Sequence, residues 1–127
     1  MKISIASDHA GLELKDYIKE YLTKKGHEVE DFGTYSKDSC DYPDFARPCA
    51  QSVANKTSEL GILVCYTGIG MSIIANKVKG VRAALVSDCF SAEATRLHND
   101  ANVIAISADI ELNMAKSMVD KFLGTSF

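Results

Sequence analysis

The sequence lacks the features of several common classes of protein. No apolar run among its 127 residues approaches the length of a membrane span, and the five residues between Lys2 and Asp8 are too few for a signal-peptide core. The formal net charge is −3, and lysines and glutamates are interspersed rather than gathered into the basic patch typical of nucleic-acid binding. We therefore expect a cytoplasmic protein with neither a membrane nor a nucleic-acid partner.

The cysteines also lack a recognisable pattern. None of the four forms a Cys-x-x-Cys pair, so the sequence predicts neither a zinc site nor a disulfide framework. Reduced thiols fit the cytoplasm. The 46% hydrophobic and 24% charged residues are typical of one domain with one core, and we expect residues 1–127 to form it.

Known glycine-loop motifs are absent as well. The pair Gly68 and Gly70 is followed by Ile73 where a dinucleotide-binding fingerprint requires a third glycine, and no Gly-Lys-Ser/Thr of a P-loop follows. A thiol phosphatase loop would place an arginine at Met71, so the guanidinium that clamps a phosphoryl group is missing. These absences leave a general anion pocket with a thiol attached.

The most informative stretch that is present surrounds Cys65. Residues 60–64 form a short apolar run, typical of a strand buried on both faces of a parallel sheet. After Cys65, residues 67–70 predict a tight turn and residues 71–77 a helix whose positive end faces the same point. A thiol beside such a terminus loses its proton more easily. The alternative is a buried structural cysteine followed by an ordinary turn.

Apolar patterns predict alternating strands and helices along the chain. The expected strands cover residues 2–7, 27–32, 60–64, 81–86 and 101–107. The expected helices run from the turn at 8–11 to Gly26, from 41–44 to Val53, from Met71 to Val78, from Ser87 or Asp88 to about His98, and from a cap at Asp109 to Gly124. We expect Pro48 to kink the second helix or to move its start later. In the first helix, lysines and glutamates should occupy the solvent face.

This alternation predicts a single-domain α/β sandwich of three layers. Its five-stranded, parallel, doubly wound sheet should be Rossmann-like, with strand order 2-1-3-4-5. Ligands in such folds bind beyond the carboxyl ends of the strands, where the strand order reverses between strands one and three. That position would bring Asp8 and His9 beside Cys65 and Thr67, which favours a functional role for the thiol.

Several motifs in sequence order resemble the B-type ribose-5-phosphate isomerases and the related galactose-6-phosphate isomerase subunits. The resemblance runs from the N-terminus to about Val103 and covers most of the chain. The motifs are Ser7-Asp8-His9-Ala10-Gly11, Asp31-Phe32-Gly33-Thr34, Asp41-Tyr42-Pro43-Asp44, Cys65 to Ser72, Ala75-Asn76-Lys77, Val81-Arg82-Ala83-Ala84 and His98-Asn99-Asp100-Ala101-Asn102-Val103.

The resemblance implies an aldose–ketose isomerase that moves a proton between adjacent carbons of a sugar phosphate through an enediolate. It implies no metal and no organic cofactor. Ribose 5-phosphate is the substrate that the resemblance favours. Family members build their sites across a two-fold interface, so it also implies a homodimer or higher homo-oligomer. Alternatives are a non-catalytic or partner-dependent subunit of a hetero-oligomeric isomerase, or a related isomerase with a different substrate.

The resemblance also implies roles for individual residues. Cys65, with Thr67 beside it, would be the base that removes the carbon-bound proton, and His98 would assist opening of the sugar ring. Backbone amides of residues 68–70 would hold the enediolate oxygen. The expected substrate-binding residues are Asp8, His9, Tyr42, Tyr66, Gly68, Ile69, Gly70, Ser72 and Asn99. Asp8 as a helix cap, Tyr42 as a packed ring and Asn99 as a helix stop remain open.

Two positions depart from the family pattern. Tyr66 stands where the family usually has glycine, which places a phenol next to the expected base. Asp109 stands where the family usually has an arginine that reaches the phosphate bound at the neighbouring subunit, and a carboxylate there would repel phosphate. The cations that could compensate are His9, Lys77, Arg82 and Arg96.

Overall fold

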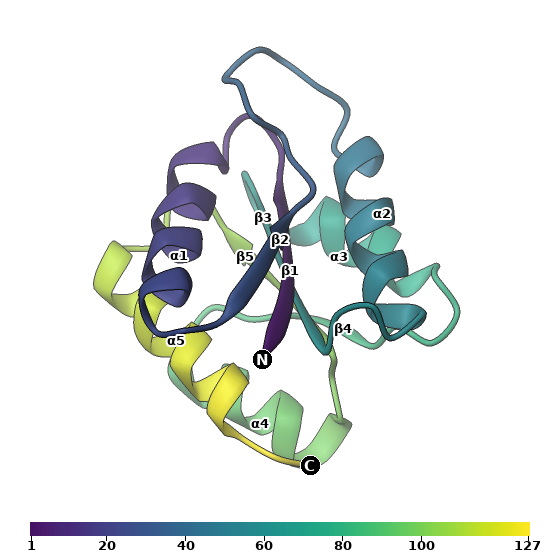
Figure 1. Cartoon of the computed structure of the whole chain (residues 1–127), viewed down its shortest axis with the longest axis vertical. Helices are drawn as coiled ribbons and strands as arrows, with labels where there is room; N and C mark the ends of the chain where they lie inside the picture. Colours follow the sequence, from purple (N-terminus) through teal and green to yellow (C-terminus); the bar gives the residue numbers. More distant parts are fainter.

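The computed structural model describes residues 1–127, and five parallel strands form one sheet between two layers of helices (Figure 1). The strands are β1 (Lys2–Ser7), β2 (Glu28–Asp31), β3 (Leu60–Cys65), β4 (Ala83–Leu85) and β5 (Val103–Ser107). The helices are α1 (Leu12–Lys24), α2 (Pro43–Ala54), α3 (Ile69–Asn76), α4 (Cys89–Asn99) and α5 (Leu112–Gly124). The predicted fold class is confirmed.

The order of the last two strands differs from the prediction. The sheet runs β2-β1-β3-β5-β4, so β5 pairs with β3 and β4 forms the edge. The first four residues of β5 are buried, whereas β4 has only three residues and none of them is buried. A strand buried on both faces gains more by lying inside the sheet, which places the shorter strand outside. The predicted reversal of strand order between β1 and β3 is present.

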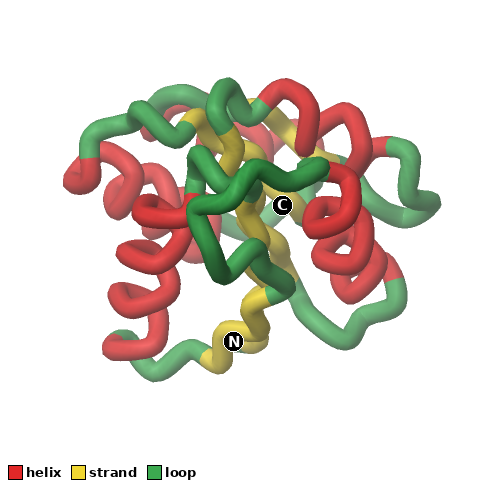
Figure 2. Tube along the Cα trace, turned by 90° about the horizontal axis from the view of Figure 1, so that it is seen from above, coloured by secondary structure: helices red, strands yellow, loops and turns green.

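Apolar side chains from both faces of the sheet fill two core clusters. One cluster packs α1, α4 and α5 against the sheet, and the other packs α2 and α3 against the opposite face. Seen from above, the helices flank the strands on both sides (Figure 2). Each large apolar side chain buried in this way contributes about 1.5–3 kcal/mol. No helix combines the length and the apolar character that crossing a membrane requires.

The start expected at residues 41–44 for the second helix is confirmed, whereas the cap expected for the last helix is wrong. Helix α2 begins at Pro43 and continues through Pro48, so its start is not displaced. Pro48 lies inside this helix of 12 residues and lacks one backbone donor, a loss that the packed helix tolerates. Helix α5 is capped by Glu111, whose carboxylate accepts the amides of Asn113 and Met114 at 3.0 Å each. Asp109 therefore does not cap α5, because the helix begins two residues later than expected.

Lys15 is a further correction, because this residue of the expected solvent face of α1 is fully buried. Its ammonium group lies 2.8 Å from both carboxylate oxygens of Asp31 and 2.6 Å from the carbonyl oxygen of Thr34. The Thr34 amide in turn donates to the carbonyl of Ser7, and the Ser7 amide donates to the carbonyl of Gly33. The buried ion pair thus connects α1, the end of β2 and the end of β1.

We predict that Lys15→Met lowers the free energy of unfolding by about 3–5 kcal/mol, because it leaves the Asp31 carboxylate buried without its main partner. Lys19→Met is the matched control, since Lys19 contacts the same carboxylate at 3.3 Å but its side chain is 43% exposed. That control should cost less than about 1 kcal/mol. Urea unfolding measures both values, and equal losses would contradict the assignment.

Candidate active site

The ends of β1 and β3 lie side by side at the carboxyl edge of the sheet. The Asp8 amide, directly after β1, donates to the carbonyl oxygen of Val64 at 3.1 Å. Cys65 ends β3 and pairs in register with Ser107 at the end of β5. The loops after these three strands therefore meet, and this edge holds the candidate thiol.

The loop after β3 turns back onto the sulfur of Cys65. The Gly68 amide donates to Cys65 Sγ at 3.1 Å, and the thiol is buried, with 5% of the residue exposed. Gly68 has a φ of +81°, and a Cβ there would lie 2.6 Å from Leu85 Cδ1 and 3.0 Å from the carbonyl carbon of Ile106. Both the conformation and the space require glycine, so this residue brings the amide to the sulfur.

The backbone amides of this loop differ in their availability. The Ile69 amide donates to Thr67 Oγ1 at 3.1 Å, and the Gly68 amide is taken by the thiol. The amides of Gly70 and Met71 have no acceptor within the protein, as expected in the first turn of a helix. Of the three amides expected to hold an enediolate oxygen, only that of Gly70 is therefore free.

Tyr42 brings the start of α2 to this loop. A Cβ built on Gly70 would lie 2.8 Å from Tyr42 Cε1 and Cζ, so the ring lies directly against the backbone of Gly70. Glycine is needed there because any side chain would displace the ring. Tyr42 thus has a packing role, and its contact places the ring beside the free amide.

His9 contacts the loop between β2 and α2. Its Nδ1 lies 3.3 Å from the Cys40 amide and 3.7 Å from Cys40 Sγ. An amide can only donate, so Nδ1 is the acceptor and the neutral imidazole carries its proton on Nε2. His9 is therefore able to donate a hydrogen bond from Nε2. Sequence reasoning missed this role of Cys40, because the loop has no periodic pattern to place it.

Three other expected residues have different surroundings. Asp8 is buried, and its Oδ1 accepts the Gly11 amide at 2.9 Å, which closes the turn before α1. Ser72 is also buried, and its hydroxyl donates to the carbonyl of Ile69 at 2.7 Å. Tyr66 is 75% exposed, and only its backbone carbonyl is engaged, by the Ser107 hydroxyl. The phenol of Tyr66 is thus exposed next to Cys65 in the sequence, whereas the Ser72 hydroxyl bonds within its own helix.

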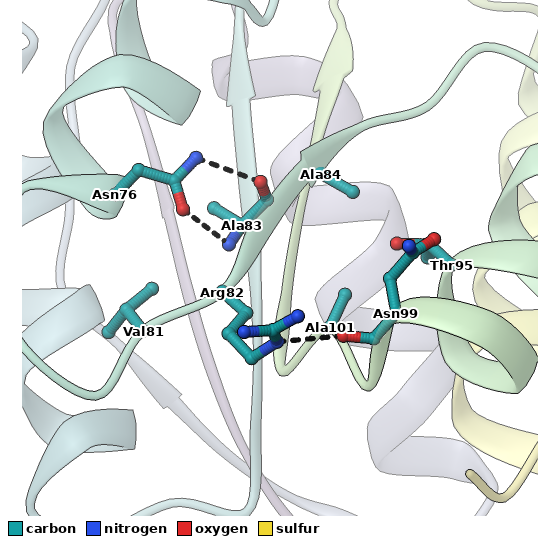
Figure 3. A pocket seen from close by; sticks show the side chains of 8 residues that line it. All are labelled: Asn76, Val81, Arg82, Ala83, Ala84, Thr95, Asn99 and Ala101. Carbon is teal, nitrogen blue, oxygen red and sulfur yellow. Dashed lines mark hydrogen bonds between the residues drawn. The ribbon is translucent and has the colours of Figure 1, made fainter.

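His98 and Asn99 lie at the opposite edge of the sheet. They end α4, which runs back from the carboxyl edge, and both are exposed. The carbonyl of Asn99 accepts a hydrogen bond from Arg82 Nε at 2.7 Å, and Arg82 directly precedes β4 (Figure 3). This contact fixes the end of α4 beside the amino ends of the strands.

The sheet register gives the distance between the Cys65 loop and the end of α4 that carries His98 and Asn99. Ala83 at the start of β4 pairs with Val103, whereas Cys65 pairs with Ser107. Four residues of extended chain separate these positions on β5, which is roughly 13 Å. One chain therefore does not bring His98 to Cys65, and the set predicted from the sequence divides between two edges.

A surface hollow of about 390 Å³ lies beside the end of α4 (Figure 3). Residues of α3, β4 and α4 and of the loops before β4 and β5 line it: Asn76, Val81, Arg82, Ala83, Ala84, Thr95, Asn99 and Ala101. The Asn76 side chain donates to the carbonyl of Ala83 at 2.9 Å and accepts the Ala83 amide at 2.8 Å. The hollow therefore belongs to the edge strand and not to the Cys65 loop.

Comparison with known proteins identifies the family. The model of the ribose/galactose isomerase family matches residues 3–127. The chain belongs to this family. The resemblance to the ribose-5-phosphate and galactose-6-phosphate isomerases is thus confirmed, and so is the prediction of an enzyme that interconverts aldoses and ketoses.

Relatives of this ribose/galactose isomerase cover almost the whole chain. Ribose-5-phosphate isomerase B of Escherichia coli is 44% identical over 99% of this chain and 85% of its own length. Galactose-6-phosphate isomerase subunit LacB of Clostridium acetobutylicum is 42% identical over 100% of this chain and 74% of its own length. The structure of ribose-5-phosphate isomerase B of Clostridium thermocellum superposes with a TM-score of 0.98 at 45% identity, covering 100% of this chain and 86% of that chain.

The thiols of this isomerase differ in their surroundings. Cys49 is completely buried in α2, and burial raises the pKa of its thiol. Cys40 and Cys89 are partly exposed. Since the thiolate is the reactive form, the accessibility and the pKa of each thiol together determine how fast it reacts.

We predict that iodoacetamide at pH 8 alkylates Cys40 and Cys89 in the folded protein and leaves Cys49 unmodified. Unfolding in urea should make all four cysteines reactive, because it removes the burial that raises the Cys49 pKa. Peptide mass spectrometry over a time course measures the modification at each site. Alkylation of Cys49 as fast as that of Cys40 in the folded protein would show that α2 opens readily.

Proposed function

We propose that the protein converts ribose 5-phosphate to ribulose 5-phosphate through an enediolate, with Cys65 as the base. The observation that carries this proposal is the Cys65 loop, where a thiol and the free Gly70 amide lie on the same turn. A base must remove the carbon-bound proton while a donor stabilises the charge that develops on the adjacent oxygen. The Cys65 loop carries both groups.

The proposed reaction is a proton transfer without net oxidation of the substrate. The Cys65 thiolate takes the proton from C2 of the open-chain aldose, and the electron pair of the C–H bond forms the enediolate. The Gly70 amide donates to its oxygen, and the Nε2–H of His9 is available to a neighbouring hydroxyl. The proton of the C2 hydroxyl passes to the C1 oxygen, and return of the abstracted proton from Cys65 to C1 then gives the ketose and restores the thiolate. His98 transfers the proton that opens the furanose ring.

A second copy of the chain supplies His98 in this proposal. Large apolar side chains remain exposed on the elements around the edge strand, which a second copy would cover. They are Ile69 and Ile73 of α3, Leu85 of β4, and Phe90 and Leu97 of α4. A two-fold contact between the β4 strands of two copies would bring the amino ends of the strands in one copy toward the carboxyl ends of the strands in the other. Homodimer formation thus completes a site that one chain leaves divided.

Charges at the two edges support this arrangement. The loops at the carboxyl edge carry an excess of carboxylates, Asp41, Asp88, Asp109 and Glu111 among them. The loops at the amino edge before β3 and β4 carry the cations Lys56, Lys77 and Lys79. A phosphate dianion is therefore better matched when a second copy brings its cationic edge to the site.

We predict that the pure protein exchanges the C2 hydrogen of ribose 5-phosphate with deuterium from D₂O, and that Cys65→Ala lowers the rate about 10²–10⁴-fold, the range for loss of a general base. Cys89→Ala is the matched control and should retain the wild-type rate, because it removes a thiol outside the Cys65 loop. Proton NMR of the sugar measures the exchange. Unchanged exchange in Cys65→Ala would exclude the thiol as the base.

We also predict that inactive Cys65→Ala and His98→Ala proteins regain activity when they are mixed, unfolded and refolded together. Half of the dimers formed at random are mixed, and each contains one site with both residues intact, so about a quarter of the wild-type activity should return. Each variant refolded alone is the control. Absence of recovery in mixed dimers of confirmed mass would place both residues in one subunit.

A second candidate function is that of a partner-dependent subunit. It is favoured by Asp109 and by the similarity to a galactose-6-phosphate isomerase subunit. In that case the pure chain would not exchange deuterium with ribose 5-phosphate or galactose 6-phosphate, and a second, different subunit would restore exchange. Activity of the pure chain with ribose 5-phosphate excludes this alternative.

A further inference from the structure

Arg82 holds the end of α4 through a charged hydrogen bond. Its Nε donates to the carbonyl oxygen of Asn99 at 2.7 Å. This carbonyl belongs to the last turn of the helix, where the final four carbonyls have no partner within the helix. A guanidinium there satisfies one of them and matches the negative end of the helix dipole. The residue just before this carbonyl group is His98.

The base of the Arg82 side chain is itself fixed. The side chain of Asn102 accepts the Arg82 amide at 2.8 Å and donates to the carbonyl of Gly80 at 3.0 Å. The Asn102 amide donates to the carbonyl of Arg82 at 3.0 Å. Three hydrogen bonds therefore join the loop before β4 to the segment before β5. Arg82 reaches Asn99 from a rigid support.

The segment after Asn99 is held from a second side. Asp100 has a left-handed backbone with a φ of 50°, and its amide donates to the carbonyl of Thr95. Arg96 donates from one terminal nitrogen to the carbonyl of Ala101 at 2.6 Å and from Nε to the carbonyl of Thr125 at 3.1 Å. A non-glycine residue keeps this backbone conformation only where its surroundings restrain it. The two arginines supply that restraint around the turn.

We propose that Arg82 is a positioning residue that fixes the orientation of His98 and Asn99 for the reaction, which rests on the function proposed above. Without its guanidinium the last turn of α4 loses the one side-chain donor at the Asn99 carbonyl, and the exposed imidazole samples more orientations. A proton-transfer group that is misplaced by about 1 Å costs on the order of 10²-fold in rate. Arg82 acts through Asn99 and does not touch the reacting carbons.

The test places Arg82→Met in one subunit of the mixed dimer of Cys65→Ala and His98→Ala chains. In the Cys65→Ala chain, which supplies the working His98, the substitution should lower the recovered kcat about 10–100-fold with little change in KM. In the His98→Ala chain, Arg82→Met should leave the recovered rate unchanged. The end of α4 in that chain contributes only to the site that lacks both Cys65 and His98. Arg47→Met is the matched control, because it makes the same exchange at an exposed arginine of α2 without breaking a side-chain bond.

Each other outcome overturns a stated part of the proposal. Equal losses from both placements would show that Arg82 supports the fold and not the α4 end of the working site. A loss confined to ribose 5-phosphate, with exchange of unphosphorylated ribose unchanged, would show that Arg82 contacts the phosphate instead. Retention of the full rate in Arg82→Lys would show that charge alone suffices. Failure of the mixed dimer to recover activity before Arg82 is changed would overturn the shared site itself.

Discussion

Parallel pairing of β1 with β3 is the constraint on which the site depends. Because both strands run in one direction, their carboxyl ends meet, and the Asp8 amide bonds to the carbonyl of Val64 at the end of β3. That contact sets His9 and Cys65 on neighbouring loops. The same rule returns every helix to the opposite edge, so a residue that ends a helix, such as His98, must lie far from the thiol of its own chain. The division of the predicted site residues between the two ends of the strands follows from the topology of the sheet.

The edge strand β4 is arranged for contact between side chains and not for extension of the sheet. An exposed strand edge presents unpaired amides and carbonyls that attract another strand. Here the Asn76 side chain pairs with both backbone groups of Ala83, as Figure 3 shows. Helix α3 is thereby fastened to β4 at its end, while its start forms the Cys65 loop. Large apolar side chains around β4, such as Leu85 and Phe90, remain exposed.

The fold class was predictable from the sequence because it depends on a regular alternation of apolar runs. The order of β4 and β5 was not, since residues 81–86 and 101–107 show similar runs and only the complete packing decides which is buried on both faces. Lys15 was placed on the solvent face for a related reason. Helical periodicity indicates which face of the helix a residue occupies. It does not indicate that Asp31 and the Thr34 carbonyl bind the Lys15 ammonium group on that face.

The site was predictable only in part. Local motifs placed Cys65, Thr67 and Gly68 correctly on one loop, because a strand, a turn and a helix follow one another directly. The contact of Tyr42 with Gly70 joins loops far apart in the sequence, and no local pattern reports it. The hydrogen bond from the Gly68 amide to the thiol was also not predictable, because it depends on a backbone angle rather than on residue type.

The position of Asp109 bears on how a sugar phosphate would be oriented. Its carboxylate contacts the hydroxyl of Ser107, which pairs in register with Cys65, so a negative charge lies beside the Cys65 loop. Two unit charges 4 Å apart repel by about 4 kcal/mol at an effective dielectric constant of 20, and salt screens the repulsion within about 10 Å. The phosphate of a bound substrate would therefore extend away from the end of β5. Under the proposed function, cations from the amino edge of a second copy would hold the phosphate better than any single residue of this rim, and the two-fold contact that completes the proton-transfer set would also supply the anion site.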